Sequence, residues 1–424
     1  MIRFQQTRMP NGLRVVLVPL HETQAVTSLL LVQVGSRYET RKLNGMSHFI
    51  EHLMFKGTEK RPSTLDISRI LDGVGADYNA FTSKDHTGYY IKSNHEHLEM
   101  SLDILSDMVF HSRFAQEEIE RERGVIVEEI NMYEDNPIMF TEDLFEETMF
   151  GDTPLGWKIA GPRENIRSVT RQELLTLREH YHVPSNMILV LSGRLPGNAT
   201  KLISKYFSIP RVKKNGKSYT GFTPHQLRPL ISVHYKDTHQ VQLALGVRGY
   251  EYLHPKLYAL HLLSVILGGT MSSRLFISIR ERQGLCYFIR SSANAYEDTG
   301  TFMIQAGLDR TRIKEAIRAI ITELDKVLKK GIKAEELTRA KQYMRGKLIL
   351  SLEDSENIAS WASKQLMFHK KILTPEQQLK KIQRITAADI HAVAKDIFQD
   401  KRLSMALIGP YRHPEEFSKL LRFP

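Results

Sequence analysis

The sequence predicts an α+β protein built from two homologous α/β-sandwich domains, each a mixed or antiparallel sheet packed with helices. Apolar, β-rich segments alternate with helical patterns in both halves of the chain. Between the halves, residues 208–229 are rich in proline, glycine and lysine, which is typical of a linker. We therefore expect an N-terminal domain at 1–210, a linker at 211–229 and a C-terminal domain at 230–424.

An internal repeat supports this duplication. Thr170 begins the segment Thr-Arg-Gln-Glu-Leu before one predicted closing strand, and Thr386 begins Thr-Ala-Ala-Asp-Ile before the other, 216 residues later. Gly193 and Gly409 end those two strands and show the same offset. The simplest account is a domain that was duplicated within one chain.

The first half begins with two β-rich apolar segments. A helix of about three turns follows, with Asn44 as its N-cap and Gly57 as its stop, and the next helix starts at Ser63. The predicted elements are strands 13–19 and 25–35, helices 44–57 and 63–75, strands 76–83 and 87–93, helices 97–111, 115–134 and 171–181, and strand 186–193.

The second half restarts the same kind of pattern after the linker. Two strands and an apolar helix come first, long helices follow, and an apolar strand closes the chain. The predicted elements are strands 231–236 and 240–247, helices 257–267, 312–330, 334–370 and 387–398, and strand 403–409.

Composition is that of a globular protein without a membrane span. No run of 18 apolar residues occurs, and the N-terminus lacks the apolar core of a secretory signal. The strand predicted from residue 13 leaves no room for a long transit peptide. The single cysteine, Cys286, excludes an internal disulfide and a cysteine-rich zinc finger. We expect a cytoplasmic protein, or a protein of an organellar matrix in a eukaryote.

The formal net charge of +11 raises the alternative of a protein that binds nucleic acid or a membrane surface. The basic residues are dispersed, however, and their clusters are as small as Lys213-Lys214 and Lys370-Lys371. No long basic stripe interleaved with aromatic residues occurs. We therefore expect no nucleic-acid partner.

Residues 44–57 contain the pattern His48-x-x-Glu51-His52. Four residues apart on a helix, the two histidines lie on one face, where both imidazoles can bind one metal ion. Glu51 reaches the same face without having to be a ligand. Histidine pairs at helical spacing also arise by chance among 17 histidines, so the pattern needs a third ligand elsewhere.

The predicted helix 115–134 supplies candidates for that ligand. Glu122 and Glu129 are two turns apart and share one face, and the apolar Val125 and Ile126 near that face indicate burial. A zinc ion held by two histidines needs a third ligand and an open position for water. Glu129 can be that ligand, and Glu122 can accept a hydrogen bond from a ligand imidazole and fix its tautomer. Most other glutamates of this helix are expected to face solvent.

With these spacings, His48, Glu51, His52, Glu122 and Glu129 together resemble the signature of the inverted-zincin peptidases. That family includes pitrilysin, insulin-degrading enzyme and the β subunit of mitochondrial processing peptidase. The resemblance implies that the two histidines and Glu129 bind Zn²⁺, one ion per chain, and that Glu51 is the general base. It also implies that Glu122 contacts a ligand side chain without binding the metal itself. Glu128 is a rival to Glu129 that matches the family spacing less well.

The second half keeps the helix but not the metal residues. An offset of about 212 residues places Leu260, Leu263 and Ser264 where the first half has its two histidines and Glu51. We expect one active site per chain.

Two further segments resemble parts of this family. Arg274 to Tyr287 is similar to a C-terminal segment whose Arg and Tyr act on substrate, which implies catalytic roles for Arg280 and Tyr287. They would hold the scissile carbonyl and stabilise its developing negative charge. The alternative is that Arg280 caps a helix and Tyr287 is strand core.

The segment Asn79, Ala80, Phe81 and Thr82 resembles the edge strand beside the family's metal, to which a substrate peptide adds as an extra strand. The alternative for these four residues is an ordinary sheet strand.

The whole-chain resemblance implies a half-size member of the family whose chains pair into a clam-shell chamber, as a homodimer or as a heterodimer with a related subunit. The expected function is a zinc-dependent endopeptidase acting on peptides or unfolded polypeptide segments. The alternative is a non-catalytic scaffold or peptide-binding protein, like the core subunits of the respiratory cytochrome complex.

Overall fold

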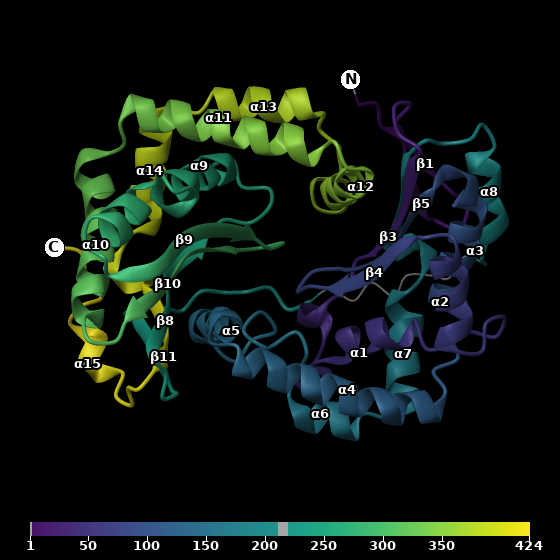
Figure 1. Ribbon diagram of the computed structural model, residues 1–424, viewed down its shortest axis with the longest axis horizontal. Helices are drawn as coiled ribbons and strands as arrows, with labels where there is room; N and C mark the ends of the chain where they lie inside the picture. The colour runs from purple at the N-terminus through teal and green to yellow at the C-terminus, as the bar shows by residue number, and fades with distance from the viewer. Residues whose placement is uncertain (1, 211–218) are drawn as a thin grey trace. The chain divides into compact units, whose positions relative to one another are not determined.

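The computed structural model describes residues 2–210 and 219–424, which form two compact units (Figure 1). Each unit takes one segment from the other half of the sequence. For the described residues, the first unit comprises Met1–Ile130, Lys158–Thr220 and Leu348–Pro375, and the second comprises Asn131–Trp157, Gly221–Lys347 and Glu376–Pro424. The division into domains at 1–210 and 230–424 stays a prediction, and residues 211–218 of the predicted linker lie outside the described residues.

The first unit contains a six-stranded sheet in the order β1-β2-β6-β3-β5-β4. Only the β2–β6 pair is parallel. Its strands are β1 (Gln5–Arg8), β2 (Arg14–Pro19), β3 (Ala25–Val32), β4 (Asp77–Thr82), β5 (Thr87–Asn94) and β6 (Met187–Gly193).

The second unit contains a five-stranded sheet in the order β7-β11-β8-β10-β9. Only the β7–β11 pair is parallel. Order and directions therefore repeat those of β2-β6-β3-β5-β4, so the duplication inferred from the sequence is present in the topology. The strands are β7 (Leu230–Tyr235), β8 (Gln240–Gly249), β9 (Cys286–Ala295), β10 (Gly300–Asp309) and β11 (Ser404–Gly409).

Helices cover each sheet, which confirms the predicted α+β fold class. In the first unit, Figure 1 shows α2 and α3 on one side of the strands and α12 on the other. The helices of this unit are α1 (Met46–Leu53), α2 (Thr64–Gly73), α3 (Leu98–His111), α4 (Gln116–Asp135, ending in the second unit), α6 (Arg163–Ser168), α7 (Arg171–Tyr181), α8 (Ala199–Phe207) and α12 (Ser355–Lys364).

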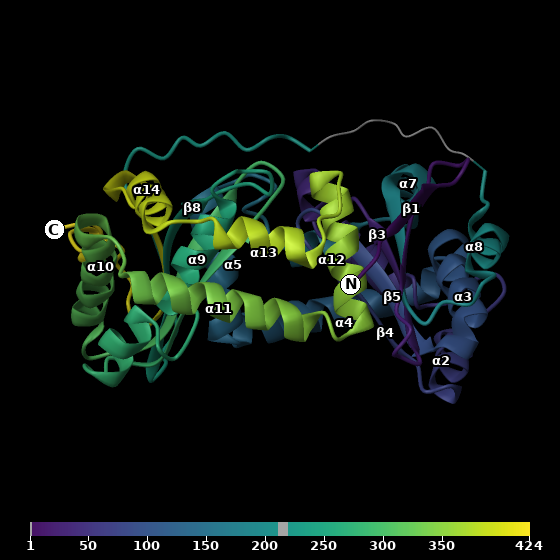
Figure 2. The ribbon, with the colours of Figure 1, turned by 90° about the horizontal axis from the view of Figure 1, so that it is seen from above.

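In the second unit, α11 and α13 run side by side (Figure 2), and Lys341 donates to the carbonyl of Gln383 at 2.7 Å. The helices are α5 (Pro137–Phe150), α9 (Leu257–Gly268), α10 (Ile313–Lys330), α11 (Ala334–Ser351, ending in the first unit), α13 (Pro375–Gln383), α14 (Ala387–Ile397) and α15 (Glu415–Ser418). Among the described residues, none of the helices is both long and apolar enough to cross a membrane.

The segments exchanged between the halves cover the second face of each sheet. In the first unit, α12 packs against β3 and β6, and the buried hydroxyls of Thr27 and Ser355 lie 2.8 Å apart. In the second unit, α5 packs against β7, β8 and β11, with Phe145 fully buried against Ala244 and Ala406. The central strands are therefore buried on both faces, which explains why β6 is continuously apolar rather than alternating.

Three of the described helices begin with a capping box, and the one cap among them that the sequence analysis predicted, Ser63, is confirmed. Thr170 forms a capping box at the start of α7, and Thr386 forms one at the start of α14, so the two repeated segments both begin a helix in the same way. Ser63 forms a third capping box at α2.

Other predictions are wrong. The helix at 44–57 is only Met46–Leu53, its N-cap is Gly45 rather than Asn44, and it ends before Gly57 because Met54 begins the turn that follows. The single helix predicted at 334–370 is two helices, α11 and α12, separated by the cap residue Asp354, whose side chain accepts from Glu356 and Asn357. Val125 is 47% exposed, so only Ile126 of that pair is buried. The elements not predicted are β1, β9, β10, α5, α6, α8, α13 and α15.

Candidate metal centre

Helix α1, which carries both histidines, is fixed at its N-terminus by a buried carboxylate. Glu39 accepts hydrogen bonds from the backbone of Gly45 at 2.8 Å and of Ser47 at 2.6 Å, and from the side chain of Asn44 at 3.2 Å. A helix begins with unpaired N–H groups and a partial positive charge, so a carboxylate there satisfies both. Burial raises the pKa of Glu39 to about 7, even though these hydrogen bonds lower it.

The turn into α1 requires glycine. Gly45 has φ of 103°, and a Cβ at this position would lie 2.6 Å from the carbonyl oxygen of Ala160. Another residue would meet both backbone strain and this contact. Glycine therefore lets the chain turn sharply and bring His48 into the first unit's core, where it is 8% exposed.

Helix α4 supplies the opposing carboxylates. Glu122 and Glu129 lie on one face of it, as their spacing predicts, and Glu122 is only 1% exposed. Glu128, the rival ligand, is exposed and does not belong to the cluster of potential metal ligands. That cluster consists of His48, His52 and Glu129, whose ligand atoms all lie within 4.8 Å of one another.

The spacing of these atoms fits zinc. The Nε2 atoms of His48 and His52 lie 3.5 Å and 3.3 Å from one oxygen of Glu129. Zinc–ligand distances of about 2.0–2.2 Å in a tetrahedral site put neighbouring ligand atoms about 3.3–3.6 Å apart. Two imidazoles and one carboxylate are also the donor set of a catalytic zinc site with an open fourth position.

The remaining polar atoms around the cluster orient the ligands. The Nδ1 atom of His52 lies 3.1 Å from Glu122, so a proton on Nδ1 leaves Nε2 free to bind a metal. The ammonium of Lys56 lies 2.7 Å from the other oxygen of Glu122. Burial raises the pKa of Glu122, but the hydrogen bonds from His52 and Lys56 outweigh it and leave this pKa below its usual value.

Hydrogen bonds among these side chains shift the pKa values of Glu129 and His52. Hydrogen bonds from both histidines hold the pKa of Glu129 well below its usual range. Burial lowers the pKa of His52, but its bonds to Glu122 and Glu129 outweigh burial and raise this pKa to about 9. The carboxylate is therefore ionised, whereas His52 must release the proton from its Nε2 atom before it can bind a metal ion.

Glu51 lies on the same helix face but outside the ligand set. Burial raises its pKa, while a hydrogen bond from the side chain of Thr82 lowers it. One of its carboxylate oxygens is buried and has no hydrogen-bond partner within the described part of the chain. A buried carboxylate with a free oxygen and a raised pKa suits a group that accepts and returns a proton.

Strand β4, which contains Asn79, Ala80, Phe81 and Thr82, is the outermost strand of its sheet and pairs only with β5. It packs against α1, so its free edge belongs to the same unit as the metal cluster. The strand position predicted from the sequence is thus confirmed, whereas peptide binding by these four residues stays a prediction.

Arg280 and Tyr287 lie together in the second unit. Arg280 belongs to a π-helical turn, Phe276–Glu281, and its guanidinium lies 4.7 Å from the ring centroid of Phe276 and 5.8 Å from that of Tyr287. Tyr287, near the start of the edge strand β9, is 72% exposed, so it is not strand core. The pair is available to a substrate, and its catalytic role stays a prediction.

Sequence reasoning missed Glu39 and Lys56. Glu39 lies outside the motif and acts on backbone N–H groups, which no side-chain pattern reveals. Lys56 had a usable signal, because it lies four residues after His52 and therefore on the same face of a helical turn.

Comparison with known proteins agrees with this geometry. Residues 14–163 match the family model described as Insulinase (Peptidase family M16), and residues 168–344 match the one described as Peptidase M16 inactive domain. A Bacillus subtilis protein described as the uncharacterized zinc protease YmxG is 34% identical over 400 residues, which cover 94% of this chain and 97% of that protein. This chain belongs to peptidase family M16.

Other relatives also align with most of this chain. A Streptomyces coelicolor protein described as an uncharacterized zinc protease is 32% identical over 96% of this chain and 90% of its own length. The crystal structure of a protease from Helicobacter pylori has a TM-score of 0.90 and 26% identity, over 97% of this chain and 100% of that one. The M16 chain therefore corresponds to these bacterial proteins over at least 94% of its length.

Proposed function

We propose that this M16 protein is a zinc-dependent endopeptidase that cleaves peptides or unfolded polypeptide segments. The observation that carries the proposal is the cluster of His48, His52 and Glu129, with the non-ligand Glu51 on the same helix face. A scaffold protein would have no need for a donor set at zinc-like spacing in which His48 is buried and His52 and Glu129 are half-buried, since such groups are costly to desolvate without a cation.

Each residue has a role set by its contacts. His48, His52 and Glu129 would hold Zn²⁺, and Glu122 would keep His52 in the metal-binding tautomer. Zinc would supply a Lewis acid for the scissile carbonyl and for the attacking water. Glu51 would take the proton from that water and pass it to the leaving amine.

Substrate would bind by its backbone. The free edge of β4 can accept an extended peptide as an additional strand, which demands little of the peptide's sequence and suits unfolded substrates. Asn79, Ala80, Phe81 and Thr82 would form this strand-binding edge.

Arg280 and Tyr287 would act on the substrate carbonyl and stabilise its negative charge. The exposure of Tyr287 and the guanidinium held beside it support this role. We infer that a homodimer brings this pair from the partner chain to the metal centre inside a chamber. The alternative to this homodimer is a heterodimer with a related subunit. A cytoplasmic location also stays a prediction.

The decisive experiment replaces Glu51 by Gln and measures cleavage of an unfolded polypeptide together with zinc content. We expect full zinc occupancy and loss of nearly all peptidase activity, because Gln fits the site but cannot accept the proton. Unchanged cleavage in Glu51→Gln would remove Glu51 as the base. Absence of cleavage by the zinc-loaded wild-type protein on a broad peptide library would favour the scaffold alternative.

A second pair of variants tests the ligand assignment. Glu129→Ala is expected to lose bound zinc, whereas the adjacent, exposed Glu128→Ala is expected to retain it. Elemental analysis after dialysis against a weak chelator distinguishes them. Full zinc in Glu129→Ala, with loss in Glu128→Ala, would transfer the ligand role to Glu128.

A further inference from the structure

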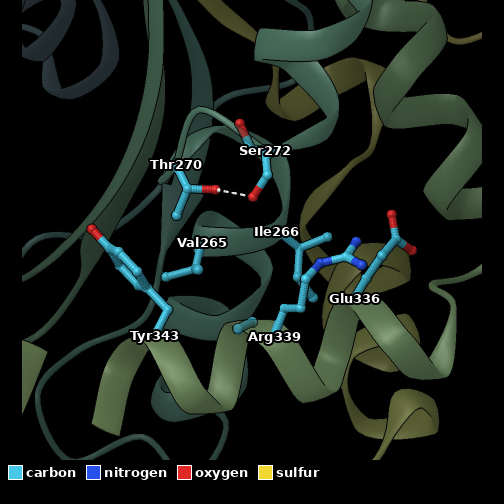
Figure 3. Close-up of a pocket in the computed structure, with 9 residues that line it drawn as sticks. Val265, Ile266, Thr270, Ser272, Glu336, Arg339 and Tyr343 are labelled. Carbon is cyan, nitrogen blue, oxygen red and sulfur yellow. Dashed lines mark hydrogen bonds between the residues drawn. The ribbon is translucent and has the colours of Figure 1, made fainter. Parts of the chain in front are cut away.

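The second unit contains a pocket of about 100 Å³ between the C-terminal end of α9, the loop after it, and α11. Figure 3 shows Thr270 and Ser272 on one side and Arg339 and Tyr343, from α11, on the other. The residues that line it are Val265, Ile266, Thr270, Ser272, Ser273, Glu336, Arg339, Ala340 and Tyr343.

One residue of this pocket corresponds in the repeat to a residue beside the metal centre. Helix α1 follows β3 and α9 follows β8, which hold the same place in their sheets, and each helix precedes the outermost strand. Helices α4 and α11 both follow the long helix after the hairpin. Ile119 and Ile126 pack in the first core at the spacing of Leu337 and Met344 in the second. Matching these pairs aligns the buried Glu122 with Ala340, which lines the pocket.

The charge of the pocket lining favours an anion. Glu336 is neutralised by Arg274, which donates to both of its carboxylate oxygens at 2.7 Å. Arg339, which is exposed like Arg345 on the same helix, also lines the pocket, and no ion pair or hydrogen bond joins it to another of the described residues. Together these three side chains leave one uncompensated positive charge at the pocket.

Hydroxyl groups supply further donors. Thr270 and Ser272 lie 3.2 Å apart by their oxygens. Ser273 is 3% exposed, and its buried hydroxyl has no hydrogen-bond partner among residues 2–210 and 219–424. A buried hydroxyl without a partner is costly, so a ligand or water that pairs with it is favoured.

The other wall is apolar, formed by Val265, Ile266 and Ala340. Inorganic phosphate would leave this wall without a partner, whereas a carboxylate with a short aliphatic chain satisfies both walls. The volume of about 100 Å³ limits the ligand to a small group of this kind.

We propose that this pocket binds a small aliphatic carboxylate, either as a free acid or as the C-terminal residue of a peptide. Arg339 and the hydroxyls of Thr270, Ser272 and Ser273 bind the carboxylate, and Val265, Ile266 and Ala340 hold the aliphatic part. The inference concerns the second unit alone and does not depend on peptidase activity.

The test is calorimetric titration of the intact Glu51→Gln protein, which cannot consume a peptide probe by hydrolysis through Glu51. The probes are isovalerate, inorganic phosphate, and a tripeptide ending in valine as the free acid and as the amide. We expect saturable binding of isovalerate or the free-acid tripeptide, and weaker binding of phosphate and the amide. Tighter binding of the tripeptide than of isovalerate identifies a peptide terminus as the source, and the reverse identifies a free acid.

Matched variants locate the site. Adding Arg339→Gln should weaken binding about tenfold or more, while Arg345→Gln, an exposed arginine on the same helix, should not. Ser273→Ala should weaken binding without lowering the protein's resistance to urea, because its hydroxyl has no partner to lose. Equal effects of Arg339→Gln and Arg345→Gln, preference for phosphate, or no saturable binding of any probe would each overturn the proposal.

Discussion

Replacing Glu39 by Gln should change how stability depends on pH. The folded-state pKa of Glu39 is raised from 4.5 to about 7, chiefly by burial, so the folded protein holds this proton more tightly than the unfolded chain. The stabilisation from the proton is complete below pH 4.5 and is lost as pH rises through about 7. Between pH 5 and pH 8 the free energy of unfolding of the wild type should fall relative to Glu39→Gln by about 2–3 kcal/mol.

The assay is urea denaturation of metal-free wild type and Glu39→Gln at several pH values between 5 and 8. Only the difference between the two proteins is used, because every other titrating group is present in both. At pH 5 Glu39 is protonated, so both side chains are neutral with one acceptor oxygen each, and the two proteins should be most alike in stability there. A difference that is constant over this range, or that grows with pH, would refute the reasoning.

Three further predictions address the metal centre, a buried histidine and the exchanged helix. Glu122→Gln should weaken zinc binding about 10–100-fold in chelator competition because His52 loses its charged partner; an equal effect of the exposed Glu128→Gln would contradict this. Burial lowers the pKa of His182 to about 3, so its contribution to stability is present above pH 6.5 and lost as pH falls toward 3. His182→Asn should therefore lose less stability than the wild type on acidification, and parallel curves would exclude this role. Phe145→Ala should lower the stability of the second unit by about 3–5 kcal/mol, measured by hydrogen exchange in β8 and β11, whereas unchanged protection there would show that α5 is dispensable.

The sequence predicted what depends on periodicity or on a local cap. The capping box at Ser63 needs only four residues, and the pairing of Glu122 with Glu129 needs only the helical repeat. Both were therefore predictable. The α1 boundaries were not, because Glu39 caps the helix from outside it and leaves Asn44 to bond the carbonyl of Lys158.

The exchange of α5 and α12 between the units could not be predicted for a different reason. An apolar face on a helix indicates that the helix packs against a sheet, but it does not indicate which sheet. Strands β6 and β11 are buried along their whole length, which shows that two faces must be covered without identifying the helices. The sequence alone does not show that Phe145 packs against Ala406 of β11 rather than against the strands that are nearer to it in the sequence.

The cost of burying ionisable groups also explains why the second half has no metal-binding residues. A buried carboxylate or imidazole is tolerable beside a cation or a hydrogen-bond partner and costly without one. Losing one metal ligand would therefore leave the others uncompensated, so they should be lost as a set. Where the first half has its metal motif, α9 has Leu260, Leu263 and Ser264, with both leucines fully buried. The hydroxyl of Ser264 faces that of Ser291, which in turn donates to the Ser264 carbonyl at 2.7 Å, so the single polar replacement is satisfied locally. The first half thus keeps ionisable side chains that compensate one another and can share a metal ion, whereas the second half has replaced all three residues of the motif.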